Sequence, residues 1–169
     1  MGGLRVGGGE AWNDQMKQFL KGHWQHVNEA SGQEFNYSLF DKEAFNYDTE
    51  PACRAVSIVK QMDSSKALDF YRNVQYGFYV DNNDPNELVF YESICNKLNI
   101  DFNKFSESFN SEIGKILVNI DFQKTQEFGI SGFPTIVLQI DDKLENIVRG
   151  YATFDAIQTR VESLLSTTA

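Results

Sequence analysis

The residues of this sequence whose types can do redox or metal chemistry are its two cysteines and its two histidines. Cys53 follows Pro51 in what is expected to be the first turn of a helix, where the helix dipole can lower the pKa of a thiol and make it a nucleophile. The alternative is a small side chain packed in the core, as buried cysteines usually are. Cys95 falls on an apolar helical stripe. We therefore expect core packing for both cysteines.

Neither pair of residues forms a complete site by spacing alone. Cys53 and Cys95 are too far apart in sequence to form a Cys-x-x-Cys dithiol, and a disulfide between them requires α-carbons within about 7 Å. We expect two reduced thiols instead. His23 and His26 lie on one helix face, but a zinc site needs three or four protein ligands and no third ligand is apparent. The sequence therefore predicts no metal and no cofactor.

The stretch FGISGFPTIVLQI, residues 128–140, carries a different kind of candidate site. Gly129 can adopt the left-handed conformation that ends a helix, and Pro134 lies in a tight loop before a β-branched run. A second such run, ENIVRG at residues 145–150, follows after the turn segment DDKL. These features predict an antiparallel hairpin. Because a single hairpin is marginal in water, it must pack against helices or another strand.

Composition excludes several classes of function. The chain has 169 residues, of which 41% are hydrophobic and 14% aromatic, which is enough for a sizeable core. Its net charge of −9 disfavours nucleic acid and anionic lipid as partners. No apolar run approaches the roughly 20 residues needed to span a bilayer. The N-terminus has no apolar signal core. We therefore expect a cytoplasmic protein without membrane contact.

Helical periodicity accounts for most of the chain before the hairpin. The DPNE segment, residues 84–87, carries the clearest helix start, because Asp84 can cap, Pro85 suits the first helical position and Glu87 completes a capping box. A strand end is expected at Leu4 to Val6. The first expected helix covers about residues 10–28. Further helices are expected to begin near Thr49, Asp63, Asp84 and Asp101, and the last helix before the hairpin is expected to end at Phe128. A final helix is expected to begin at Thr153. The stripe expected inside the helix that ends at Phe128 is Ile113, Ile116, Leu117 and Ile120.

Four segments carry a likeness to a known family: MGGLR, GQEFNYSLFDKEAFNYDTEPACRAV, FYRNVQYGFYVDNNDPN and FQKTQEFGISGFPTIVLQ. With them the chain resembles the DsbA family of thioredoxin-like proteins, in particular its cytoplasmic disulfide isomerase branch. The resemblance implies an α/β thioredoxin-like fold with a large inserted helical domain, mostly helical as given. It divides the chain into a remnant of the second thioredoxin strand at 1–9, an inserted helical domain at 10–128 and a C-terminal ββα half at 129–169.

The resemblance also implies a role for the proline loop. Pro134 matches the family's cis-proline, and the backbone of Phe133 would pair with a substrate chain like an added strand. The expected partners are protein or peptide thiols and disulfides, with glutathione as a further one. The family's first strand and Cys-x-x-Cys helix have no counterpart here, so the resemblance assigns no catalytic residue to this chain. That half would lie upstream of Met1 in a longer protein or reading frame, or has been lost.

Three functions remain open from the sequence. The first is a thiol–disulfide oxidoreductase or isomerase of the DsbA class, and the second is a peptide-binding module without redox chemistry. The third is a glutathione-dependent enzyme like the 2-hydroxychromene-2-carboxylate isomerases. In all three, the strand beginning at Pro134 would lack its neighbour within this chain. An unpaired strand edge invites pairing with another chain, so self-association is expected.

Overall fold

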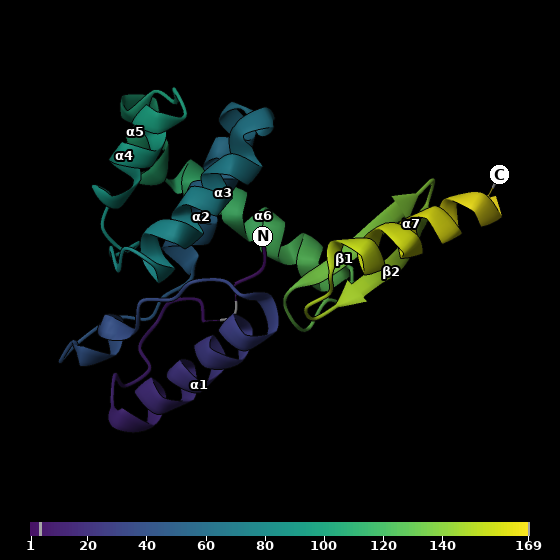
Figure 1. Cartoon of the computed structure of the whole chain (residues 1–169). Helices are drawn as coiled ribbons and strands as arrows, with labels where there is room; N and C mark the ends of the chain where they lie inside the picture. The colour runs from purple at the N-terminus through teal and green to yellow at the C-terminus, as the bar shows by residue number, and fades with distance from the viewer. Residues whose placement is uncertain (4, 169) are drawn as a thin grey trace. The chain divides into compact units, whose positions relative to one another are not determined.

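The computed structural model describes residues 1–3 and 5–168, which divide by their contacts into two units (Figure 1). The first unit, Gly3–Asp121 together with Met1, holds most of the helices, and the second begins at Phe122. No helix of the described residues is long and apolar enough to cross a membrane. The helices are α1 (Asp14–Ser31), α2 (Glu50–Met62), α3 (Ala67–Tyr79), α4 (Phe90–Lys97), α5 (Phe102–Phe109), α6 (Glu112–Glu127) and α7 (Phe154–Thr168), with 3-10 turns η1 (Tyr37–Asp41) and η2 (Ser64–Lys66).

Local capping signals predict some of these helix starts and not others. The Asp101 side chain accepts hydrogen bonds from the backbone N–H groups of Asn103 and Lys104 and begins α5 as expected. The start predicted at Asp84 is wrong, because the chain forms only turns there and α4 begins at Phe90. The Asp84 carboxylate does accept from the backbone N–H of Asn86. The capping contact is therefore made, but it closes a turn instead of a helix.

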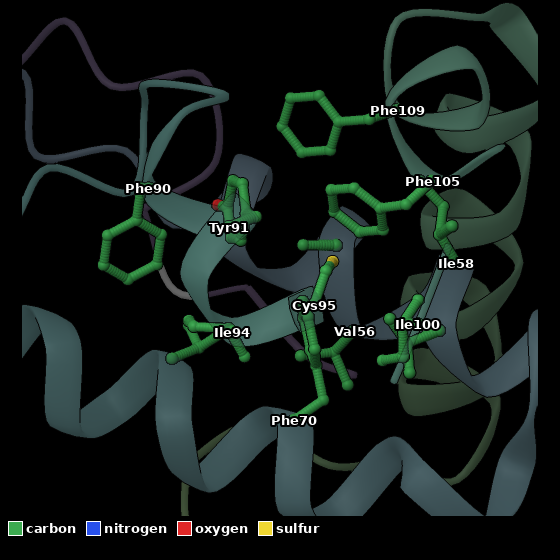
Figure 2. Close-up of a cluster of buried hydrophobic side chains, with 13 residues drawn as sticks. Val56, Ile58, Phe70, Phe90, Tyr91, Ile94, Cys95, Ile100, Phe105 and Phe109 are labelled. Atoms are coloured by element: carbon green, nitrogen blue, oxygen red, sulfur yellow. The ribbon is translucent and has the colours of Figure 1, made fainter. Parts of the chain in front are cut away.

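The main core of the first unit lies between α2, α3, α4 and α5 (Figure 2). Three fully buried aromatic side chains lie at its centre, Phe70, Tyr91 and Phe105, with ring centroids 5.6 to 6.2 Å apart. The Tyr91 hydroxyl donates to the backbone oxygen of Pro85 at 2.6 Å, so its polar end is satisfied inside the core. Aliphatic residues complete the cluster: Val56, Ile58, Val59, Ile94 and Ile100.

A second, aromatic cluster fixes the long irregular connection between α1 and α2. Trp24 of α1 lies at its centre, with its ring 4.8 Å from Phe40 and 5.1 Å from Tyr79. Aromatic side chains of the connection thus pack against the helices and hold it in place. The further members are Leu20, Phe35, Tyr37, Leu39, Phe45, Tyr47 and Phe78, with Trp12 and Met16 at the edge.

Of the stripe predicted inside α6, Leu117 is half-buried and packs against the main core, but the three isoleucines do not. Ile113, Ile116 and Ile120 are 65%, 55% and 53% exposed, and the buried face carries Gly114 and Val118 instead. The buried face of α6 is determined by its close contact with the end of α5 and with α2. A side chain at Gly114 would overlap the backbone oxygen of Ser108 and contact Ile58 of α2. A glycine allows two helices to lie nearer to each other than any larger residue would.

Helical periodicity also predicts buried stripes that include Leu68 and Tyr71 in α3 and Phe19, Leu20, Trp24 and Val27 in α1, and the structure shifts part of each. In α3, Leu68 and Tyr71 are exposed, and Phe70 lies in the core in their place. In α1, Phe19 and Val27 are about half exposed although Leu20 and Trp24 are buried as expected. Neighbouring positions on a helix differ by about 100°, so the apolar pattern alone leaves the centre of the buried face uncertain by one residue.

The second unit contains the sheet, an antiparallel pair formed by β1 (Thr135–Ile140) and β2 (Lys143–Arg149). Asp141, with φ of 51°, lies in the tight turn between them. The register pairs Thr135 with Arg149 and Ile140 with Lys143, with an irregularity between Ile136 and Val137. Helix α7 lies along this hairpin and contacts β2 (Figure 1). The predicted hairpin and final helix are therefore confirmed.

The strand end predicted at residues 4–6 is not formed by the described residues, and Leu4 lies outside them. Arg5 instead exchanges hydrogen bonds with Thr49, whose hydroxyl accepts from the Arg5 backbone N–H and whose own N–H donates to the Arg5 oxygen. The prediction fails for a physical reason. A strand needs a hydrogen-bonded neighbour, and the described sheet consists of β1 and β2.

Candidate functional site: the proline loop and the edge of the hairpin

The loop begins where α6 ends, in a motif that fixes the direction of the chain. Gly129 has φ of 65°, and its N–H donates to the Gln126 oxygen, while the N–H of Ile130 donates to the Thr125 oxygen. This pair of bonds is a Schellman motif, which satisfies the last carbonyl groups of a helix. The predicted left-handed glycine cap is therefore confirmed, and the chain leaves α6 in a defined conformation.

The loop is attached to the sheet on both sides of its proline. The Phe133–Pro134 peptide bond is cis, as expected from the resemblance. The Thr135 hydroxyl donates to the Gly132 oxygen at 2.7 Å, and the Gly150 N–H donates to the Pro134 oxygen at 2.8 Å. The loop and the start of β1 are thus held by the loop's own backbone and by the end of β2. We call this region, Phe133 to Thr135 with Arg149 to Tyr151, the cis-proline end of the hairpin.

At the cis-proline end, β1 has hydrogen-bonding groups that β2 does not use. The Pro134 oxygen points toward β2, because it accepts from Gly150. Backbone groups of successive strand residues point to opposite sides, so the N–H and C=O of Thr135 point away from β2. Among the described residues no other strand pairs with β1. This edge can accept an extended chain through main-chain hydrogen bonds.

Apolar side chains stand exposed around the same end of the hairpin. Phe133 and Ile136 are each 39% exposed, and Tyr151 and Phe154 are 59% and 74% exposed. The consecutive apolar residues Ile136 to Leu138 predict a strand covered on both faces, and this prediction is wrong at Ile136. Because exposed aromatic surface is used to bind ligands and partners, these side chains give the edge an apolar surrounding.

Neither cysteine is suited to bind or attack a substrate, because both are buried. Both are free thiols, Cys53 6% exposed and Cys95 fully buried. Burial raises the pKa of each thiol to about 11, and for Cys53 this outweighs the positive charge of the N-terminal amino group. A thiol attacks disulfides only as its thiolate, so neither residue is an activated nucleophile. The core-packing interpretation of both cysteines is confirmed.

The histidines do not form a site either. His23 and His26 are exposed on α1, and the His23 ring packs edge-on against Phe19 at 4.4 Å. Within the described residues, no group of three metal-ligating side chains comes together.

Sequence reasoning missed two features with a defined chemistry. One is the buried Asp121, which accepts from the Ser57 hydroxyl at 2.8 Å and from the Lys60 amino group at 2.6 Å. Burial on its own would raise the pKa of Asp121, but these hydrogen bonds outweigh it and the pKa lies below its usual value. The other is Arg149, which the hairpin register places opposite Thr135. Counting outward from the Asp141 turn would place Val148 opposite Thr135, and only the irregularity between Ile136 and Val137 brings Arg149 there.

Comparisons with known proteins identify the family and the fold. A family model described as thioredoxin matches residues 10–158. A solved structure of a provisionally assigned protein disulfide isomerase from Nitrosomonas europaea is 29% identical, with a TM-score of 0.87 over 93% of this chain and 77% of that one. A cytosolic disulfide reductase, DsbM from Pseudomonas aeruginosa, is 19% identical with a TM-score of 0.76 over 98% and 82% of the two chains.

The DsbM structure with GSH gives 20% identity and a TM-score of 0.71 over the same shares of the two chains. Identities at this level show the fold alone. A comparison with curated proteins gave no match. The fold is therefore thioredoxin-like and mostly helical, with a small sheet, as the sequence predicted.

Proposed function

The chain belongs to the thioredoxin family, and from that premise we propose that it contributes the substrate-binding half of a thiol–disulfide oxidoreductase or isomerase. In this function Phe133 and Pro134 bind an extended peptide that carries a thiol or disulfide, and the peptide adds a strand to β1. The unused backbone edge of β1 at Thr135 is the observation that carries the proposal. The similarity to a disulfide isomerase at 29% identity supports the redox class.

The attacking dithiol comes from outside these 169 residues. Cys53 and Cys95 are buried, their pKa values are raised to about 11, and neither lies in a Cys-x-x-Cys pair. Thiol–disulfide exchange requires a thiolate that can reach the substrate sulfur. The role of this chain is then to hold the substrate backbone in a fixed position, which lowers the entropic cost of the exchange step.

A peptide-binding function without redox chemistry is the second candidate, and the burial of both cysteines favours it. The two functions share the edge of β1 and differ in whether a dithiol acts on the bound chain. For the redox function we propose thiol or disulfide peptides of the cytoplasm as partners, with glutathione as a further one.

The test uses the full chain and a fluorescent peptide whose cysteine is S-methylated, so that binding is measured without exchange. The matched control is the same peptide with N-methyl groups at alternate residues, which removes the donors that an added strand needs. We expect saturable binding of the first peptide and at least tenfold weaker binding of the second. Equal binding of both peptides would contradict pairing with β1.

The redox part of the proposal has its own measurement. In an insulin-reduction assay, the chain alone is expected to show no turnover above the rate of the small reductant. Turnover that persists in the Cys53→Ala, Cys95→Ala double variant would show a redox group that the proposal does not contain.

A further inference from the structure

Two basic side chains lie between Gly129 and Phe154, and the hairpin separates them. Lys143 is paired with Ile140 beside the turn, and Arg149 is paired with Thr135 beside Pro134. The cis-proline end of the hairpin therefore carries one positive charge on a chain whose net charge is −9. The turn end of the hairpin carries the second positive charge, Lys143, at the opposite end of β2.

The Arg149 guanidinium is available to a ligand. The side chain is exposed, and none of the ion pairs of the described residues includes it. By contrast, Arg5 pairs with Glu10 and Arg54 pairs with Glu50. An arginine presents a planar group of donors that matches the two oxygens of a carboxylate.

The register directs this group toward the proposed peptide. Residues paired across two strands carry their side chains on the same face, so Arg149 and Thr135 lie side by side. Neighbouring strands are about 4.8 Å apart, so a peptide added to the free edge of β1 lies about 10 Å from the backbone of β2. The long arginine side chain can extend over the small Thr135 and meet an acidic side chain of the peptide between the two.

We propose that Arg149 binds a carboxylate of the substrate held along β1, so that the preferred substrate is a thiol or disulfide peptide with a negative charge close to its sulfur residue. The inference rests on the proposed function, because it assumes that the peptide pairs with β1. The exposed ring of Tyr151 adds an apolar surface at the same end. Together they describe a site for a peptide that is acidic and partly apolar.

The carboxylate has two chemical sources, which the experiment separates. One is an Asp or Glu side chain beside a cysteine in a protein. The other is a free carboxylate of a small thiol peptide such as glutathione. The probes are an S-methylated cysteine peptide with a neighbouring Glu, the same peptide with Gln in its place, and S-methylglutathione. None of the three can exchange disulfides with Cys53 or Cys95.

The affinity of each probe is measured by titration calorimetry or by amide chemical shifts, with the wild-type chain and with Arg149→Gln, Arg149→Lys and Lys143→Gln. An exposed charge pair is expected to change affinity by about 1.5-fold to fivefold. Arg149→Gln should weaken the acidic probes by that factor and leave the Gln peptide unchanged. Arg149→Lys should retain part of the preference, and Lys143→Gln should match the wild type.

The outcomes distinguish this inference from the function on which it rests. If the Glu and Gln peptides bind equally to the wild-type chain, or if Arg149→Gln weakens both alike, the role of Arg149 is refuted while peptide binding stands. If no probe binds at all, pairing with β1 fails, and the role of Arg149 fails with it. Weakening of the Glu peptide alone assigns the site to protein substrates, and weakening of S-methylglutathione alone assigns it to the small thiol.

Discussion

Replacing Gly114 with alanine should destabilise the chain, although alanine is the better helix former. A Cβ at this position would overlap the backbone oxygen of Ser108 and lie 3.1 Å from Cδ1 of Ile58 and 3.4 Å from Cδ of Arg54. The first contact cannot be relieved by a side-chain rotation, because its partner is backbone. Helix α6 would have to move away from α2 and the end of α5.

The magnitude follows from two opposing terms. Glycine to alanine in a helix interior gains about 1 kcal/mol from backbone entropy. Overpacking in a closely packed region costs about 1–3 kcal/mol, and a clash with backbone lies at or above the upper end. Gly114→Ala should therefore lower the free energy of unfolding by about 2 kcal/mol or more.

The matched control is Gly22→Ala in α1, where an added Cβ meets nothing within 4 Å. There the propensity term acts alone, so we expect a gain of about 0.5–1 kcal/mol. Urea denaturation followed by circular dichroism gives both values. If Gly114→Ala is as stable as Gly22→Ala, the close approach of α6 described above is incorrect.

Four further predictions concern the buried thiols, the buried Asp121 and the sheet edge. Because their pKa values are raised to about 11, only about one part in a thousand of each thiol should be thiolate at pH 8. Both thiols should therefore resist Ellman's reagent until the chain is unfolded, and rapid labelling of the native chain would contradict this. Because burial raises these pKa values, stability should fall as pH rises from about 9 toward about 11. Ser57→Ala should lower the free energy of unfolding by about 1–3 kcal/mol, because Asp121 loses a hydrogen bond. Because the pKa of Asp121 is lowered, this loss should shrink as pH falls below about 4, which urea titrations at several pH values would check. Because strand β1 carries no charge, sedimentation should show self-association that increases with concentration. Gln139→Lys should reduce this association, and equal association of the wild-type and Gln139→Lys chains would rule out pairing through this edge.

The features predicted well from the sequence depend on neighbours along the chain. The hairpin follows from two β-branched runs around a turn, and the end of α6 follows from Gly129. The resemblance supplied Pro134, because no local pattern marks one X–Pro bond as cis. Together these residues are enough to locate the candidate site in the sequence.

The errors concern contacts between elements distant in sequence. The inner face of α6 is determined by Gly114 against Ile58 and by Asp121 against Ser57, and neither pair is visible in an apolar pattern. Because Asp121 is polar, periodicity placed it outside and the isoleucines inside. Arg149 was missed for a related reason, since its importance depends on a cross-strand partner.

The central claim is that β1 offers its free edge beside Pro134 to an extended peptide. Amide hydrogen exchange at Thr135, measured by NMR with and without the S-methylated peptide, tests it most directly. The account predicts fast exchange in the free chain and clear protection when the peptide is bound, with the matched N-methylated peptide giving none. Protection of Thr135 already present in the monomeric free chain, or exchange that remains fast with the peptide bound, would contradict the account.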